Sequence, residues 1–181
     1  MAALQIGQRM PSFSLPGTDG ETYSGDSFAD KRFLTVLFLA NHCPYVSAWE
    51  DRIVAIANEF GDRGVGFAAF GSNDVERFPA DDLDHMKQRS AEAGYPFPYL
   101  FDKDGDAARA FGATRTPEVF VFDQERHLQY HGAVDSDYEE SSHMDNYLRE
   151  ALDRLLTGQT VPLRETPVVG CVIKTRAVTA G

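Results

Sequence analysis

The sequence predicts an α/β sandwich, with a central mixed sheet and helices on both of its faces, and three observations support this class. First, two almost unbroken apolar segments, 33–40 and 65–70, have the composition of strands buried on both faces, as in parallel sheets. Second, a helix-period segment lies between them and can supply the crossover that parallel strands require. Third, alternating strands and helices are followed by a strand pair and a final helix.

The N-terminal half opens with short apolar pieces around Gly and Pro at 6–24, which predict a small strand pair with a turn at 18–20. After the strand 33–40, Pro44 suits a first helical turn because its missing N–H costs nothing there. The helix that follows ends near Gly61 and Gly64. Its apolar face is predicted from residues at three- and four-residue steps: Val46, Trp49, Ile53, Ile56, Ala57 and Phe60.

The second half predicts three further helices, three further strands and a tail. A helix over 82–93 stops at Gly94, and a short helix covers 106–111. The strands are expected at 97–101, 118–122 and 128–130, and the last helix at 144–156. The tail spans 159–181, so we expect a single domain over 1–181 of thioredoxin type, a thioredoxin-like sandwich with an N-terminal strand pair and an extended C-terminal tail.

Composition excludes several classes of function. The formal net charge is −11, and such a surface repels nucleic acid and anionic membranes, so neither partner is expected. The first residues contain no apolar run long enough for a signal peptide, and no window approaches the ~20 apolar residues of a membrane helix. The expectation is a soluble, cytoplasmic protein. The sequence is compatible with a homodimer and does not determine the oligomeric state.

The chain has two cysteines, Cys43 and Cys171, which are too few for a disulfide scaffold. They lie 128 positions apart (171 − 43), so the chain has no short-spaced metal pair, and no metal or cofactor is expected. In a reducing compartment lone cysteines are often inert core residues. Composition by itself leaves that alternative open.

The position of Cys43 favours a reactive thiol, because the residue lies between a buried strand and the helix that follows. Sites in open α/β sheets form at the carboxyl ends of strands. A helix N-terminus has unpaired N–H groups and a partial positive charge, and both stabilise a thiolate. His42 is adjacent in sequence and would add to this effect if protonated. The pattern predicts an acidic thiol at the first turn of a helix, accessible from a shallow pocket.

Two other features accompany Cys43. Proline at the start of a central strand is unusual, and we expect the Thr116–Pro117 bond to be cis and to lie beside Cys43. From Gly158 to Cys171 is 13 residues, a reach of roughly 43 Å when extended. A domain of this size has a radius of gyration of about 16 Å, so the tail is long enough to bring Cys171 to Cys43. The spacing does not require it, and a buried tail cysteine is the alternative.

Several motifs together resemble the alkyl hydroperoxide reductase/thiol-specific antioxidant (redoxin) branch of the thioredoxin-like superfamily. They are NHCPYV at 41–46, GSND at 71–74, YPFPYLFDKDGDAARAFGATRTPEVFVFD at 95–123 and TPVVGCVIK at 166–174. More narrowly, the chain resembles the peroxiredoxin-like proteins that carry NHCPYV after the first core strand. The resemblance extends over nearly the whole chain, with the motifs in the same order.

The resemblance implies roles for individual residues. Cys43 takes the place of the reactive cysteine, and Pro117 that of the cis-proline, with Thr116 facing the thiol. Two departures concern the chemistry. Val46 stands where a dithiol redoxin has its second cysteine. Ala40 and Val36 stand where peroxiredoxins have Thr and Pro, and the residues considered as substitutes for the missing hydroxyl are Asn41, His42 and Thr116.

The function expected from these residues is a thiol-dependent oxidoreductase. Cys43 would act as nucleophile in peroxide reduction or thiol–disulfide exchange, and Cys171 is a candidate resolving thiol. The expected partners are a small peroxide or disulfide and a thiol electron donor, thioredoxin or glutathione-like. The alternative is a non-catalytic thioredoxin-fold binding or redox-sensing module. A copper-binding relative ranks last because the paired cysteines of such sites are absent.

Overall fold

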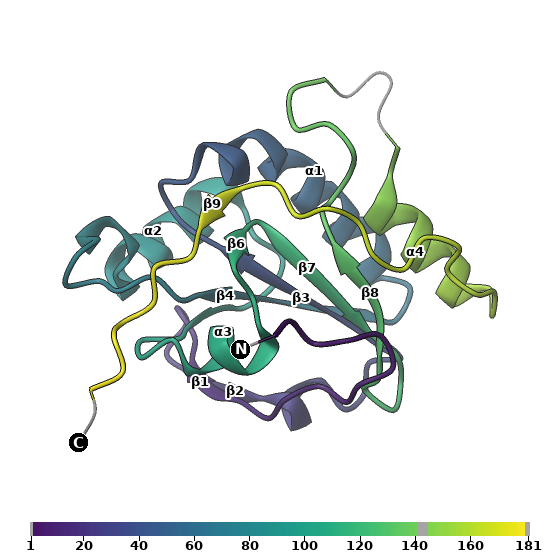
Figure 1. The fold of residues 1–181 in the computed structure, drawn as a ribbon, viewed down its shortest axis with the longest axis horizontal. Helices are drawn as coiled ribbons and strands as arrows, with labels where there is room; N and C mark the ends of the chain where they lie inside the picture. Colours follow the sequence, from purple (N-terminus) through teal and green to yellow (C-terminus); the bar gives the residue numbers. More distant parts are fainter. Residues whose placement is uncertain (1, 141–144, 180–181) are drawn as a thin grey trace.

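The computed structural model describes residues 2–140 and 145–179 of the chain. Its central feature is a five-stranded sheet with helices on both faces (Figure 1). In chain order the strands and helices, with two short 3₁₀ helices η1 and η2, are β1 (Ser14–Pro16), β2 (Thr22–Ser24), η1 (Gly25–Phe28), β3 (Phe33–Leu39), α1 (Pro44–Gly61), β4 (Val65–Gly71), η2 (Pro79–Asp81), α2 (Leu83–Ala93), β5 (Tyr99–Phe101), α3 (Asp106–Phe111), β6 (Arg115–Thr116), β7 (Glu118–Phe122), β8 (Leu128–Gly132), α4 (Tyr147–Leu156) and β9 (Cys171–Val172).

The sheet is mixed, as the sequence predicts. Its strand order is β5-β4-β3-β7-β8, with β3 parallel to β4 and β4 parallel to β5. The pairs β3–β7 and β7–β8 are antiparallel. Helix α1 is the crossover between the two central parallel strands, so the carboxyl end of β3 leads directly into its first turn.

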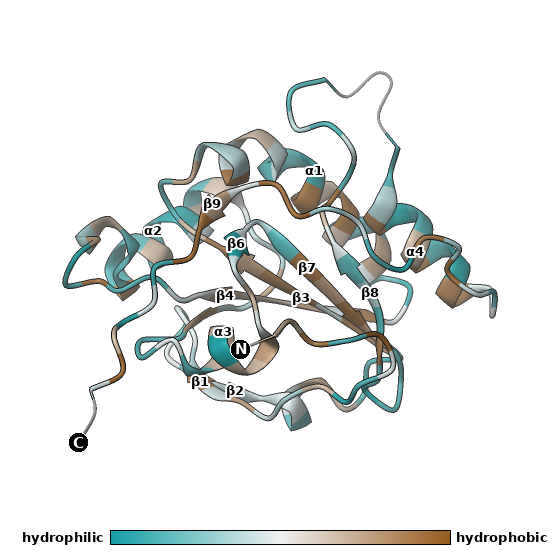
Figure 2. Ribbon diagram, in the orientation of Figure 1, coloured by the Kyte–Doolittle hydropathy of each residue, from teal (hydrophilic) through white to brown (hydrophobic). Residues whose placement is uncertain are grey.

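The side chains of β3 divide between two apolar layers, because successive residues of a strand point to opposite faces. Leu37 and Leu39 pack in the layer that includes α1, α2 and α4. Val36 and Phe38 pack in the opposite layer, with α3 and the β1–β2 pair. Figure 2 shows the same pattern, with hydrophobic colour along the inner strands and hydrophilic colour on the outer parts of the helices. The predicted α/β thioredoxin-like sandwich is therefore confirmed.

Three boundaries differ from the sequence prediction. β5 begins at Tyr99 rather than at 97, because Pro98 has no N–H to donate to a neighbouring strand. β8 continues to Gly132, and the backbone of His131 in this added part pairs with the tail at 164–166. The last helix begins at Tyr147, because Asn146 has non-helical backbone angles; the predicted start at Met144 lies outside the described residues. Within the described part of the chain, no helix is long and apolar enough to cross a membrane.

The C-terminal tail runs from α4 back over the edge of the sheet towards α2 (Figure 1). Two glycines allow its close approach. A Cβ at Gly132 would lie 2.0 Å from the Thr166 hydroxyl, and a Cβ at Gly170 would lie 2.0 Å from the Thr116 carbonyl oxygen. Directly after Gly170 the tail passes over β6, where β9 pairs with it antiparallel. The tail is therefore built into the fold by backbone contacts.

Candidate active site

Cys43 is the N-cap residue of α1, with extended backbone angles (φ −77°, ψ 122°) and Pro44 at the first helical position. This is the position the sequence predicts. The predicted access from a shallow pocket is wrong, because the residue is only 1 % exposed. The reason is tertiary: β6 and the tail strand β9 lie over the start of the helix.

The Thr116–Pro117 peptide bond is cis, and it lies beside the thiol as expected. The Cys43 thiol donates a hydrogen bond to the carbonyl oxygen of Thr116, at 3.3 Å. The Thr116 side chain is also buried, and its hydroxyl oxygen has no hydrogen-bond partner. Burying a hydroxyl without a hydrogen-bond partner costs free energy of folding. The Thr116 hydroxyl is therefore available to donate a hydrogen bond to a thiolate formed at Cys43.

The tail brings Cys171 to the same point. In the β6–β9 pair, Cys171 is directly opposite Thr116, the residue whose carbonyl accepts the hydrogen bond from the Cys43 thiol. Cys171 also packs against the apolar layer that contains Cys43. Both cysteines are free thiols, with Cys43 buried and Cys171 partly exposed. The two thiols thus lie in the same region, although 128 positions (171 − 43) separate them in the sequence.

The two thiols are perturbed in opposite directions. Burial raises the pKa of Cys43, but donation to its thiolate by the neighbouring Cys171 thiol, the Thr116 hydroxyl and the amide of Val46 outweighs burial, and the pKa lies below its ordinary value. Burial and the interaction with Cys43 raise the pKa of Cys171 to about 11. Deprotonation therefore begins at Cys43, and Cys171 keeps its proton as a donor to that thiolate.

The other candidate residues do not reach the sulfur in the same way. The backbone amide of Asn41 donates to Asp81 at 2.8 Å, while its side chain bonds the carbonyl of Ala80 and the hydroxyl of Tyr99. His42 Nδ1 lies 3.0 Å from Asp81. The His42 ring therefore pairs with a carboxylate rather than with the thiol. Val36 packs in the layer on the opposite face of the sheet, and Ala40 is a buried residue in the Cys43 layer.

A comparison with models of protein families shows the family to which the chain belongs. The family model named Redoxin matches residues 5–148. The chain belongs to the Redoxin family. A comparison with proteins of curated function gives no match. The narrower NHCPYV grouping that the motifs suggest stays a prediction.

Solved structures agree with the family match. The chain is 34% identical to a hypothetical protein from Sinorhizobium meliloti 1021, with a TM-score of 0.91 and 97% of each chain covered. It is also 34% identical to an uncharacterized conserved protein from Geobacillus kaustophilus, with a TM-score of 0.92 and coverage of 97% and 95%. The peroxidoxin BcpB from Mycobacterium tuberculosis is 18% identical, with a TM-score of 0.62 and coverage of 85% and 95%, and shows the shared fold.

Sequence reasoning missed the residues that hold the β6 segment. Glu118 accepts hydrogen bonds from the amides of Thr114 and Arg115, at 2.7 and 3.0 Å, and pairs with His131 at 2.6 Å. The main chain of His131 is in turn bonded to the tail at 164 and 166. This buried pair therefore links the loop before the cis-proline to the tail, and no local sequence signal announces it.

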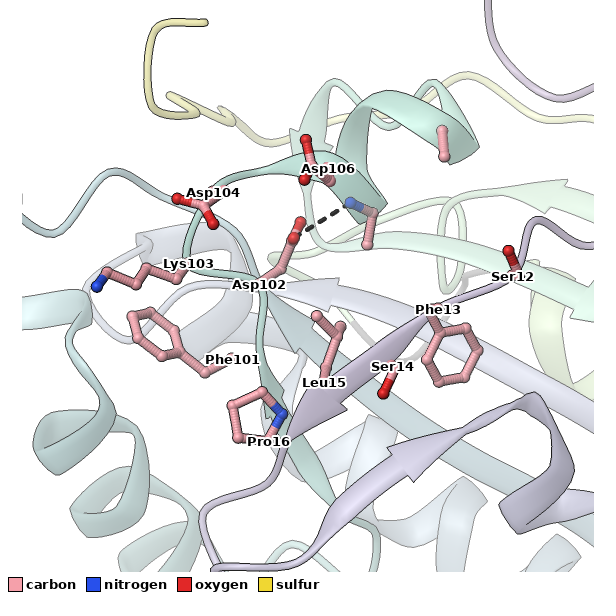
Figure 3. A pocket seen from close by; sticks show the side chains of 12 residues that line it. Ser12, Phe13, Ser14, Leu15, Pro16, Phe101, Asp102, Lys103, Asp104 and Asp106 are labelled. Carbon is pink, nitrogen blue, oxygen red and sulfur yellow. Dashed lines mark hydrogen bonds between the residues drawn. The ribbon is translucent and has the colours of Figure 1, made fainter. Parts of the chain in front are cut away.

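A cavity of about 750 Å³ lies away from the thiols, between β1 and the loop that leads from β5 to α3 (Figure 3). At its wall Asp102 accepts the amides of Ala107 and Ala108, at 3.1 and 3.0 Å, as a residue that starts a helix does. The described residues contain no cluster of three or more His, Cys, Asp or Glu suited to a metal ion.

Proposed function

We propose that the protein is a two-thiol oxidoreductase in which Cys43 is the nucleophile and Cys171 the resolving thiol. Membership of the Redoxin family supports a thiol oxidoreductase in general. The observation that carries the finer proposal is the position of Cys171 opposite Thr116 in the β6–β9 pair, beside the carbonyl that accepts the hydrogen bond of the Cys43 thiol. The pKa of Cys43 is lowered there and that of Cys171 is raised. Paired groups whose environments separate their pKa values are the usual arrangement for a nucleophile and its partner.

The first proposed reaction is peroxide reduction. The Cys43 thiolate attacks one peroxide oxygen, the O–O bond breaks, and an alcohol or water leaves after taking a proton, which forms the Cys43 sulfenic acid. The Cys171 sulfur then attacks the sulfenic sulfur, and water leaves as the disulfide forms. A donor with two thiols, thioredoxin or two glutathione molecules, reduces this disulfide and is itself oxidised.

The burial of Cys43 favours a small substrate for this reaction, because the sulfur is covered by the tail. Thiol–disulfide exchange is the second candidate. It is favoured by Ala40 and Val36, which stand where peroxiredoxins carry Thr and Pro. One preorganised donor at a reacting oxygen is worth roughly 10²–10³ in rate, so slow peroxide turnover is expected unless Thr116 supplies it.

Disulfide exchange begins with attack of the Cys43 thiolate on a disulfide sulfur. One sulfur of the substrate leaves as a thiol, and the other forms a mixed disulfide with Cys43. Attack by Cys171 then releases the second thiol. Both candidate reactions end in the same Cys43–Cys171 disulfide and need the same donor. A reducing compartment such as the cytoplasm supplies such thiols, which accords with the expected location.

Purified wild-type protein, Cys43→Ser and Cys171→Ser test the proposal. Each is assayed with hydrogen peroxide, an alkyl hydroperoxide and a mixed glutathione disulfide, with thioredoxin or glutathione as donor. We expect Cys43→Ser to be inactive and wild-type protein to show the 43–171 disulfide by mass spectrometry. In Cys171→Ser, excess peroxide should drive Cys43 to sulfinic acid. Equal rates for Cys43→Ser and wild type in every assay would replace the enzyme by the binding or redox-sensing module.

A further inference from the structure

The segment Gly71–Asp74, GSND in sequence, follows the carboxyl end of β4 and takes no part in the proposed chemistry. Its asparagine nevertheless lies between the two segments that carry the thiols. Asn73 is 9% exposed, and both polar atoms of its side-chain amide are hydrogen-bonded. Nδ2 donates to Asp81, and Oδ1 accepts a hydrogen bond from the backbone amide of Lys174, each at 2.8 Å. Lys174 comes three residues after Cys171.

Asp81, at the end of η2, is the second half of this unit. It is 5% exposed, and its carboxylate accepts the backbone amide of Asn41 at 2.8 Å and the side-chain amide of Asn73. His42 Nδ1 lies 3.0 Å from the same carboxylate. A buried carboxylate is stable only when its oxygens are satisfied, so the three groups hold one another in a single arrangement. Asn41 and His42 directly precede Cys43.

We propose that Asn73 and Asp81 are positioning residues that fix the separation of the two thiols. This inference rests on the thiol pair of the proposed function. One unit, the 73–81 pair, binds the backbone just before Cys43 and just after Cys171. The tail is also bonded at Lys174 by its carbonyl oxygen, which accepts the amide of Asp74 at 2.8 Å. On the other side of Cys171, Arg115 donates to the carbonyl of Gly170 at 2.8 Å.

The chemical consequence is a high effective concentration of one thiol at the other. When folding already holds two groups in reactive geometry, their reaction is faster and its product more stable, because the entropy of bringing them together is not lost in the reaction itself. Without the Asn73 amide, the tail beyond β9 loses one of its two backbone bonds at Lys174. We therefore expect Asn73→Ala to weaken the 43–171 disulfide and to move the Cys171 thiol away from the Cys43 thiolate.

The experiment measures two quantities on the full chain. The first is the equilibrium with glutathione, in which the dithiol and one glutathione disulfide give the protein disulfide and two glutathione thiols. The second is the pH midpoint of Cys43 alkylation by iodoacetamide. For Asn73→Ala we expect the equilibrium constant to fall about tenfold and the midpoint to rise. If this variant does not fold, Asn73→Ser is measured instead, and the same directions are expected.

Two further variants separate positioning from simple stability. Ser72→Ala removes a buried hydrogen bond of the same segment, to Asp102, and should leave both quantities at wild-type values. The double substitution Asn73→Asp with Asp81→Asn exchanges the two side chains, keeps an amide facing a carboxylate, and should recover at least half of the loss on a logarithmic scale.

Wild-type values of both quantities in the residue-73 variant would overturn the positioning role while leaving the proposed function intact. A shift of equal size in Ser72→Ala would also overturn it. If the wild-type protein forms no 43–171 disulfide, the resolving step of the proposed function fails. The alkylation midpoint does not require that disulfide, so a raised midpoint in Asn73→Ala would still support positioning, and an unchanged one would contradict it.

Discussion

Cys43 and Cys171 meet at one point, but they are held there in different ways. Cys43 lies at the junction of β3 and α1, where all seven strand residues are buried and the inner face of the helix is apolar. Cys171 lies in a tail whose strand, β9, has only two residues, one partly buried and one exposed. The tail is fixed by backbone hydrogen bonds to 73–74 and 114–115 and by the close approach of Gly170.

Because of this difference, substitutions in α1 should act mainly on the free energy of unfolding, and substitutions in the tail mainly on the pairing of the two thiols. Apolar burial in α1 supports the whole fold, so damage there should lower the free energy of unfolding. The tail contacts bury little apolar surface, and Val169 and Val172 on either side of Cys171 are 40% and 52% exposed. Damage to the tail should therefore change the reactions of the two thiols more than it changes folding.

The largest expected effect is the loss of folding stability caused by a substitution in α1, the helix that begins after Cys43. Ile53→Ala removes a side chain that is 1% exposed in α1 and should lower the free energy of unfolding by about 2–5 kcal/mol. Urea unfolding measures this, with the exposed neighbour Asp51→Ala as control, which should change it by no more than about 0.5 kcal/mol. Under folding conditions the 43–171 disulfide should still form. A large loss of disulfide with unchanged stability would reverse the comparison.

The next largest expected effect is on the rate of disulfide formation, and it follows from a substitution in the C-terminal tail. Gly170→Val places a side chain where a Cβ already lies 2.0 Å from the Thr116 carbonyl oxygen, so β9 must move away from β6. We expect intramolecular disulfide formation to slow about 10²-fold, while Cys43 alkylation becomes faster because its cover is displaced. Ala177→Val introduces the same side chain at an exposed tail position and should change neither rate. Wild-type disulfide kinetics in Gly170→Val would show that the tail contact does not matter.

A smaller effect concerns pH. The thiolate is the form that iodoacetamide attacks, and the pKa of Cys43 is held below its ordinary value in part by the Cys171 thiol. In Cys171→Ala that donor is lost while burial remains, so the midpoint of Cys43 alkylation should move to higher pH. Cys171→Ser keeps a donor and should move it less. In the wild type, Cys171 should react with a midpoint near pH 11. Equal midpoints for the two variants would contradict a role for this hydrogen bond.

The smallest effect concerns two buried hydroxyls. Thr116 and Thr35 both lack a hydrogen-bond partner for Oγ1, so replacing either with Val should raise the free energy of unfolding, by up to about 1 kcal/mol. Only Thr116→Val should also raise the pKa of Cys43, because only that hydroxyl faces the sulfur. Urea unfolding and alkylation against pH measure the two properties. A raised Cys43 midpoint in Thr35→Val would contradict the local explanation.

Much of the fold could be predicted because its signals are local. The apolar segments 33–40 and 65–70, the periodic face of α1 and the proline after Cys43 each depend on neighbouring residues. These signals placed Cys43 at a helix N-terminus, and the structure agrees. The cis bond before Pro117 could also be predicted. A trans proline is commoner at a strand start, and it is the thioredoxin-type order of elements that favours cis.

The remainder depends on contacts between residues far apart in sequence, which have no local pattern. Tail length permits Cys171 to reach Cys43, but the contact requires the β6–β9 pair and glycines at 132 and 170. The same contacts bury Cys43, which the sequence predicted to be accessible. The chain by itself determined which thiol starts a helix, because that follows from neighbouring residues. Only the tertiary structure decided which thiol faces it, because β6 and β9, whose paired residues lie 55 and 57 positions apart (171 − 116 and 172 − 115), had to pair first.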